Sequence, residues 1–202
     1  MSGANHNSNS FLNKQKVDKI GNTIIYLATH INDLYITKLL KLIYLLDELS
    51  IKERGIPFLG LKYKVWQAGP VNRDLYIDIN EGVTIFKNYF TVTQNGTSTQ
   101  IITDIPFNDD EFSDSDIALL DRIVDLYKFK TGPELVSLTH RPSSLWYKKA
   151  KETGLLESFN DGTRNSSDRE LSMEDLLIEQ EDKLKIYREH IEFQKTINSL
   201  QK

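Results

Sequence analysis

The segment TKLLKLIYLLDELSIKERG (Thr37–Gly55) decides the fold that we predict for this chain. Thr37 is suited to cap the start of a helix, and Gly55 is suited to end it. Apolar side chains cover most of the circumference of this helix: Leu39, Leu40, Leu42, Ile43, Leu45 and Leu46. Because a helix that is apolar nearly all round is buried nearly all round, we expect it to be the central element of the fold.

Apolar residues spaced three and four positions apart predict further helices around the central one. Residues suited to N-caps precede two of them: Ser113, followed by Asp116 as in a capping box, and Ser143 or Ser144. The stripe before the central segment consists of Val17, Ile20, Ile24, Leu27 and Ile31. We expect helices over residues 17–31, 113–127, 133–138 and 144–151.

Two segments favour β-structure. Alternating residues from Leu61 to Trp66 predict a short strand, which Gly69-Pro70 ends, and Pro70 is suited to the first turn of a helix over 71–79. Asn95-Gly96 lies between the β-prone runs 89–93 and 97–103, which predicts a hairpin with a primed turn.

The C-terminal segment from Ser172 is predicted to form one long, charged helix. Its apolar residues fall into two stripes, one of Leu177, Leu184, Tyr187 and Ile191 and one of Ile186, Phe193, Ile197 and Leu200. Such a helix can dock on its own domain or enter a groove of a partner.

Together these elements predict a mainly α protein. We expect a compact helical domain over 14–160, built around a central buried helix, with a small antiparallel β-sheet or hairpin. Residues 1–13, rich in Asn and Ser, are predicted to be a disordered tail, and residues 161–202 a loop with a C-terminal helical extension.

Composition restricts the classes of function. The net charge of −4 and the pI of about 5.6 argue against non-specific binding to nucleic acid, which needs a basic face. The chain has no cysteine, so disulfides, thiolate metal sites and cysteine nucleophiles are excluded. Its apolar runs fall short of the ~20 residues that span a bilayer. We therefore expect a cytoplasmic protein that binds neither nucleic acid nor membrane.

Three blocks of sequence resemble the SocA-like antitoxin domain, also called Panacea. The first is Lys16–Gly55, with Lys38, Lys41, Tyr44 and Asp47 in its most recognisable run. The second is GLKYKVWQAGPVNRDLY, residues 60–76, with Trp66 and Gly69-Pro70-Val71. The third spans residues 112–150 and contains Leu138-Thr139-His140 and Trp146. The order and spacing of the blocks agree with the family, although no single block is specific.

The resemblance implies an antitoxin, phage-associated, that is encoded beside a toxin gene. Its partner would be a cognate protein toxin that inhibits translation, related in some cases to small alarmone synthetases. Neutralisation in such pairs is usually by direct complex formation, which gives a hetero-oligomer of toxin and antitoxin. At least one branch of the family instead delivers its toxin to a protease.

From the residues we expect two groups of functionally relevant side chains. The first group is structural, and in it Lys38 or Lys41 forms a buried ion pair with a carboxylate: Lys38, Lys41, Tyr44, Asp47, Trp66, Gly69, Pro70, Thr139, His140 and Trp146. The second group supplies exposed aromatic anchors and an acidic cluster for partner binding: Tyr89, Phe90, Asp109, Asp110, Glu111, Tyr187 and Phe193. The acidic cluster is also explained as a solvated face before a helix N-terminus, which suits the helix dipole.

The motifs give no positive case for an enzyme. The histidines His6, His30, His140 and His190 are scattered without metal-ligand spacing, and no phosphate loop or nucleophile elbow occurs. We therefore predict no catalytic residue, no metal and no cofactor. The alternatives are a proteolytic adaptor, an enzyme of unrecognised type and a transcriptional autorepressor, the last disfavoured by the acidic balance.

Overall fold

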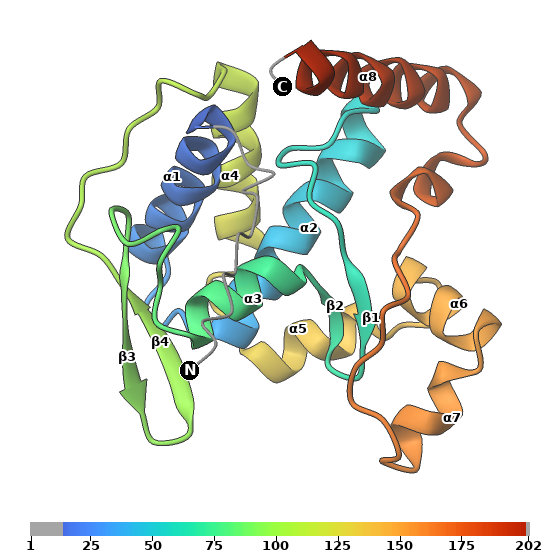
Figure 1. Ribbon diagram of the computed structural model, residues 1–202, viewed down its shortest axis with the longest axis horizontal. Coiled ribbons are helices and arrows are strands. Elements are labelled where there is room, and N and C mark those ends of the chain that lie inside the picture. Colours follow the sequence, from blue (N-terminus) through green and yellow to red (C-terminus); the bar gives the residue numbers. More distant parts are fainter. Residues whose placement is uncertain (1–13, 201–202) are drawn as a thin grey trace, which may run out of the picture.

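A computed structural model describes residues 14–200, except for the side chain of Asn198. Its helices pack around one central helix, and two small β-hairpins lie at the edge of this core (Figure 1). The elements are, in chain order, α1 (Lys14–His30), α2 (Ile36–Arg54), β1 (Lys64–Trp66), β2 (Gly69–Val71), α3 (Arg73–Asn80), β3 (Thr91–Asn95), β4 (Ser98–Ile102), α4 (Asp114–Tyr127), α5 (Gly132–Thr139), α6 (Leu145–Glu152), α7 (Leu155–Asn160), the 3-10 helix η1 (Met173–Leu177) and α8 (Glu181–Leu200). The predicted mainly α class is confirmed.

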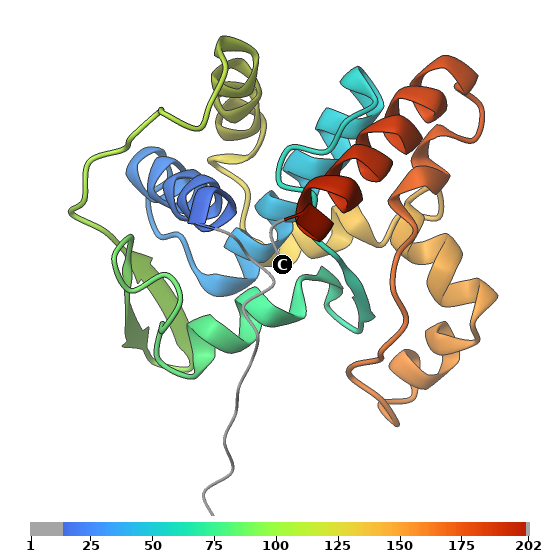
Figure 2. The ribbon, with the colours of Figure 1, turned by 45° about the horizontal axis from the view of Figure 1, so that its top comes forward.

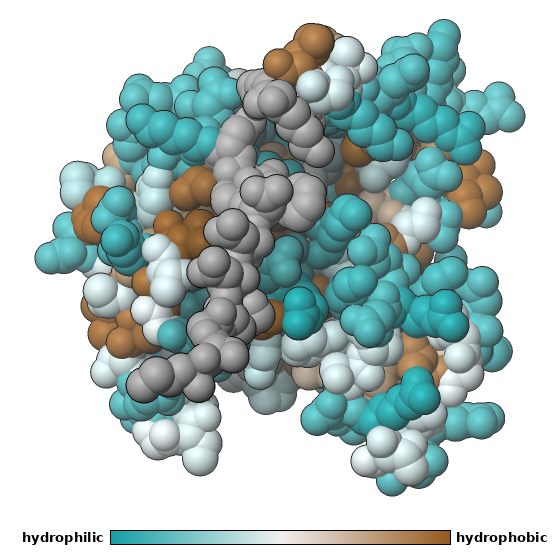
Figure 3. All heavy atoms as spheres, in the orientation of Figure 1, coloured by the Kyte–Doolittle hydropathy of each residue, from teal (hydrophilic) through white to brown (hydrophobic). Residues whose placement is uncertain are grey.

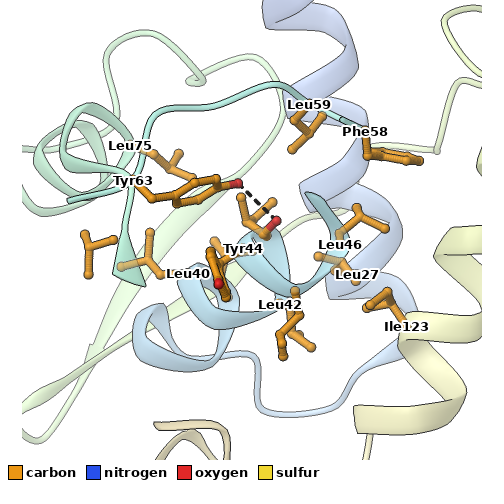
Figure 4. Close-up of a cluster of buried hydrophobic side chains, with 14 of the residues drawn as sticks. Leu27, Leu40, Leu42, Tyr44, Leu46, Phe58, Leu59, Tyr63, Leu75 and Ile123 are labelled. Carbon is orange, nitrogen blue, oxygen red and sulfur yellow. Dashed lines mark hydrogen bonds between the residues drawn. The ribbon is translucent and has the colours of Figure 1, made fainter. Parts of the chain in front are cut away.

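Helix α2 is the buried centre, as its apolar circumference predicts. It packs against α4, α5, β2 and η1. Figure 4 shows its side chains Leu40, Leu42, Tyr44 and Leu46 among buried residues of neighbouring elements. The helix begins at Ile36 rather than after Thr37, and no side chain caps its N-terminus. Gly55 ends it as predicted, with a φ of +72° that a side chain would oppose.

Helices α1 and α4 pack together on one side of α2. The predicted capping box at the start of α4 is present, with Ser113 and Asp116 exchanging hydrogen bonds. Asp116 also accepts hydrogen bonds from Lys19 of α1 (3.0 Å) and Arg54 of α2 (2.9 Å). One carboxylate therefore ties three helices together at this end of the core.

The short sheet β1–β2 differs from the prediction. Gly69, Pro70 and Val71 form a second strand antiparallel to β1, and Pro70 lies opposite Val65. Helix α3 therefore starts later, at Arg73, after the N-cap Asn72. The strand was not predicted because Gly and Pro favour turns and have low β-propensity.

The predicted hairpin is confirmed as β3–β4, but its turn lies one residue further along the chain. Asn95 pairs with Ser98, so Gly96 and Thr97 form the two-residue loop. Gly96 has a φ of +63°, in the left-handed region that glycine adopts at little cost.

Helix α5 begins one residue before Pro133, where its start was predicted, and α6 begins at one of its two predicted caps. Thr131 and Glu134 form a capping box for α5, and Ser144, rather than Ser143, caps α6. Helix α7 was not predicted. It is short, and it follows Gly154, whose φ of +70° turns the chain after α6.

The C-terminal helix predicted from Ser172 is in fact two helices, η1 and α8, separated at residues 178–180. Leu171, Met173 and Leu177 are buried in the core. Helix α8 lies against the end of α2 (Figures 1 and 2), where Gly55 makes room for Ile186 and the backbone of Lys183. The chain before η1 runs beside β1.

The predicted tail, residues 1–13, lies outside the described residues. The boundary at residue 160 stays a prediction, and residues 165–177 contribute hydrogen bonds and buried side chains to the same core. Over residues 14–200, no helix has the length and hydropathy to cross a membrane.

Candidate functional site

Six of the residues singled out in the sequence meet around the turn between β1 and β2, and we call them the motif cluster: Lys41, Gly69, Pro70, Thr139, His140 and Trp146. They come from α2, β2, the end of α5 and the start of α6. The Lys41 Nζ donates a hydrogen bond to the Pro70 carbonyl at 3.0 Å. Strand β2, which was not predicted from the sequence, is therefore held in place by Lys41, a residue distant from it in the chain.

Gly69 is held in a position that no other residue fits. Its φ is +100°, outside the conformations that side chains ordinarily allow. A Cβ atom there would lie 2.7 Å from the Thr139 Oγ1 and 2.9 Å from the Lys41 Cε. Both the backbone angle and the close packing therefore require glycine.

His140 and Trp146 hold the β1–β2 turn from the other side. One ring nitrogen of His140 lies 2.6 Å from the Val136 carbonyl and the other lies 2.9 Å from the Gln67 carbonyl. The Trp146 Nε1 donates to the Trp66 carbonyl at 2.9 Å, and its ring centroid is 3.7 Å from that of His140. Both side chains thus bind backbone of the turn.

Among residues 14–200, the expected ion pair of Lys38 or Lys41 with a carboxylate is not formed. The Lys38 Nζ donates to the Lys128 carbonyl at 2.8 Å, and Lys41 bonds Pro70, so a backbone carbonyl replaces the carboxylate in each case. Lys41 is 1% exposed, and burial lowers the pKa of its amine from 10.5 to about 7. Carbonyl partners cannot neutralise a cation, so its charged form is costly.

Asp47 organises a second buried group, above the middle of α2. Its carboxylate accepts hydrogen bonds from the backbone N–H groups of residues 59, 60 and 61, at 2.6–3.1 Å, and from the Tyr63 hydroxyl at 2.7 Å. Burial raises the pKa of Asp47, although these four donors oppose the shift. Tyr44 packs edge-on against Tyr63 at 5.2 Å (Figure 4).

Sequence reasoning missed a similar role for Asp78. Its Oδ1 accepts hydrogen bonds from the N–H groups of Thr84 and Ile85, each at 2.8 Å, and from the Thr84 hydroxyl at 2.7 Å. These bonds hold the loop after α3, in which Val83 adopts a φ of +52°. An Asp at the end of a helical segment was the only local signal.

The proposed aromatic anchors have different environments. Phe90 is 1% exposed and lies in the core, so the expectation that it is exposed is wrong. Tyr89 is half-buried over Gly21 and bonds Asp18. Tyr187 is half-buried beside a cavity of about 320 Å³ between α8 and the domain. Phe193, at 61% exposure, is open to a partner.

The acidic cluster lies in the connection between β4 and α4. Asp109 and Asp110 are exposed and Glu111 is half-buried. Over the described residues, no hydrogen bond, ion pair or ring contact joins them to Phe193 or to Tyr187. That these residues form one partner-binding surface stays a prediction.

One exposed aromatic was overlooked in the sequence. Phe129 follows α4 and is 88% exposed, and Leu126, one turn earlier, is 50% exposed. Figure 3 shows a mainly hydrophilic face with separate hydrophobic patches, not one broad apolar area. A single exposed apolar residue is common on protein surfaces and needs no explanation. Phe129 and Leu126 are of interest because they lie one turn apart and are both exposed, which the sequence does not show without knowledge of where α4 ends.

The motif cluster and the Asp47 group favour a structural role over chemistry. Their polar atoms bind backbone groups of the same chain and point inward. Within residues 14–200, no three His, Asp or Glu side chains lie close enough together to hold a metal ion. This arrangement stabilises the scaffold of the domain.

Comparison with known families agrees with this geometry. The family described as "Antitoxin SocA-like, Panacea domain" matches residues 39–147, a span that contains all but the first three residues of α2, the motif cluster and the Asp47 group. No curated protein and no solved structure matches the chain. Because the family match covers more than half of its 202 residues, the chain belongs to the SocA-like antitoxin family with a Panacea domain.

Proposed function

We propose that this protein neutralises a cognate toxin by binding it directly. The observation that carries the proposal is the internal use of the motif side chains. Lys41, Asp47, His140 and Trp146 bind backbone within the domain, which leaves them unsuited to act on a substrate. The antitoxin-like domain implies a toxin as partner in general terms.

The outer surface supplies the contacts in this proposal. Phe193 and Phe129 are exposed aromatic side chains of the kind that anchor interfaces. Asp109, Asp110 and Glu111 add negative charge, which suits a toxin whose active site binds nucleotide or RNA. We propose a translation-inhibiting toxin, such as a relative of small alarmone synthetases, and a hetero-oligomer as the inactive state. No catalytic step by this chain is part of the proposal.

Co-expression tests the proposal. The product of the neighbouring open reading frame is expressed with and without this protein, and growth and co-purification are measured. We expect growth to be rescued and the two chains to elute together. Absence of both rescue and complex would reject the proposal.

Surface variants then locate the interface. Phe129→Ala, Phe193→Ala and the pair Asp109→Asn/Asp110→Asn are expected to weaken the complex without changing the melting temperature, because these side chains are exposed. Lys148→Ala, also exposed and on α6, is the control. If none of the three weakens the complex, the interface lies elsewhere. If rescue in cells needs a protease, the protein is instead an adaptor.

A further inference from the structure

A groove of about 690 Å³ lies beside β1. The lining consists of Trp66 of β1, Arg73 of α3 and residues 163–169, together with Thr153 after α6 and Leu155 of α7. Figures 1 and 2 show the segment before η1 running between β1 and the helices α6 and α7. Its volume falls within the ~300–1,000 Å³ typical of small-molecule sites.

The wall formed by residues 163–169 is fixed to β1. The N–H of Val65 donates to the Arg169 carbonyl at 2.8 Å, and that of Gln67 donates to the Asn165 carbonyl at 2.9 Å. The Trp66 Nε1 donates to the Ser167 carbonyl at 3.2 Å. Side chains on this segment therefore start from a positioned backbone, as a preformed binding site requires.

Three arginines line the groove: Arg73, Arg164 and Arg169. Within the described residues, their guanidinium groups form no hydrogen bond or ion pair. Outside the groove, Arg54, Arg122 and Arg188 each bond a carboxylate, whereas Arg141 forms no side-chain bond within the described residues. Among the described residues that line the groove, Asp168 alone carries a carboxylate, so the lining has a net positive charge in a chain whose net charge is −4.

We propose that this groove binds a phosphorylated small molecule of nucleotide size. A guanidinium group can donate two parallel hydrogen bonds to one phosphate. Three guanidinium groups therefore offer more donors and more positive charge than a single carboxylate ligand can use, and they suit a polyphosphate. The Ser166 hydroxyl adds a neutral donor, and Trp66 adds an aromatic surface at the border of the groove. The proposal does not rest on the antitoxin function, because no partner is needed for it.

Calorimetric titration of the purified full chain tests it, with pyrophosphate and ADP as probes at low ionic strength, where exposed charges are least screened. We expect saturable one-to-one binding of both. The triple variant Arg73→Gln/Arg164→Gln/Arg169→Gln should bind at least ten-fold more weakly. Arg141→Gln, an exposed arginine outside the groove, should bind as the wild type does.

Single variants keep the test valid if the triple variant fails to fold. Each of Arg73→Gln, Arg164→Gln and Arg169→Gln changes an exposed side chain, so we expect an unchanged melting temperature and a two- to five-fold loss of affinity. The proposal is overturned by the absence of saturation at 10 mM probe. It is equally overturned if Arg141→Gln weakens binding as much as the groove variants, since net charge alone would then explain the effect.

Discussion

Replacing Lys41 with Met should change how the stability of the fold depends on pH. The Lys41 amine is buried against a carbonyl, and burial lowers its pKa from 10.5 to about 7. Between these values the unfolded chain binds a proton that the folded chain releases. The free energy of unfolding of the wild type therefore rises with pH across this window, and the rise is absent in Lys41→Met.

The size of the effect follows from the shift. At about 1.4 kcal/mol per pKa unit, protonated Lys41 costs the folded state roughly 5 kcal/mol at pH values well below 7. From pH 7.5 to 9.5, the wild type should gain roughly 2.5 kcal/mol relative to the variant. The variant loses the hydrogen bond to Pro70 and leaves that carbonyl unpaired, at a cost of about 1–3 kcal/mol. It should thus be the more stable protein at pH 7.5, and its advantage should vanish or reverse by pH 9.5.

Urea unfolding followed by circular dichroism at pH 7.5, 8.5 and 9.5 measures the difference. The difference between the unfolding free energies of the two proteins at each pH cancels the contributions of groups that titrate in both. Lys148→Met, which removes an exposed lysine from α6, is the matched control and should track the wild type at each pH. Parallel curves for the wild type and Lys41→Met would refute the reasoning, because a lysine that stays protonated in both states has no such dependence.

Three further predictions concern the scaffold and its surface. Gly69→Ala should lower the free energy of unfolding by roughly 2–5 kcal/mol, through backbone strain and overpacking. Gly82 has a φ of +112°, but among the described residues no atom lies within 4 Å of the position that an added Cβ would take. Gly82→Ala should therefore cost only the backbone strain, about 1–2 kcal/mol. Equal losses of stability in Gly69→Ala and Gly82→Ala would disprove the packing argument. Asp47→Asn should lower the free energy of unfolding, measured with urea, by about 3 kcal/mol, because an amide N–H would face backbone N–H donors. The control Asp109→Asn changes an exposed side chain and should alter stability little. Unchanged stability of Asp47→Asn would contradict the role of this carboxylate. Phe193→Ala should weaken the toxin complex about ten-fold or more in a binding titration while leaving stability unchanged, and unaltered affinity would remove this residue from the interface.

Local signals in the sequence predicted most of the helices. The apolar circumference of residues 39–46 identified α2 as central. The cap Ser113 marked where α4 begins, and the pair Ser143-Ser144 marked the start of α6 to within one residue. These signals act within a few residues, so they are readable without knowledge of the fold. The break between η1 and α8 was missed because both sides of it continue a helical pattern.

Features that depend on distant partners were not predictable in the same way. The strand at Gly69-Pro70 exists because Lys41 and His140, from helices on either side, bind the turn and its strand. The partner of Lys41 was mistaken for a carboxylate, since sequence shows which charges are present but not which carbonyl lies within reach. The burial of Phe90 likewise follows from tertiary packing.

The surface was the least predictable part of the molecule. Phe193 was identified from an apolar stripe, but Phe129 has no periodic neighbours that would mark it as exposed. Arg73 precedes the other two groove arginines by more than ninety positions. It lies near them because residues 163–169 return to β1. No motif could have joined them.

Titration of the purified toxin with this protein, in a reconstituted translation assay without any protease, tests the proposed function most directly. If the folded domain binds and blocks the toxin, translation should recover fully at one equivalent, and Phe193→Ala should need a clear excess to reach the same recovery. Toxin activity that persists at a ten-fold molar excess of folded protein would contradict direct neutralisation.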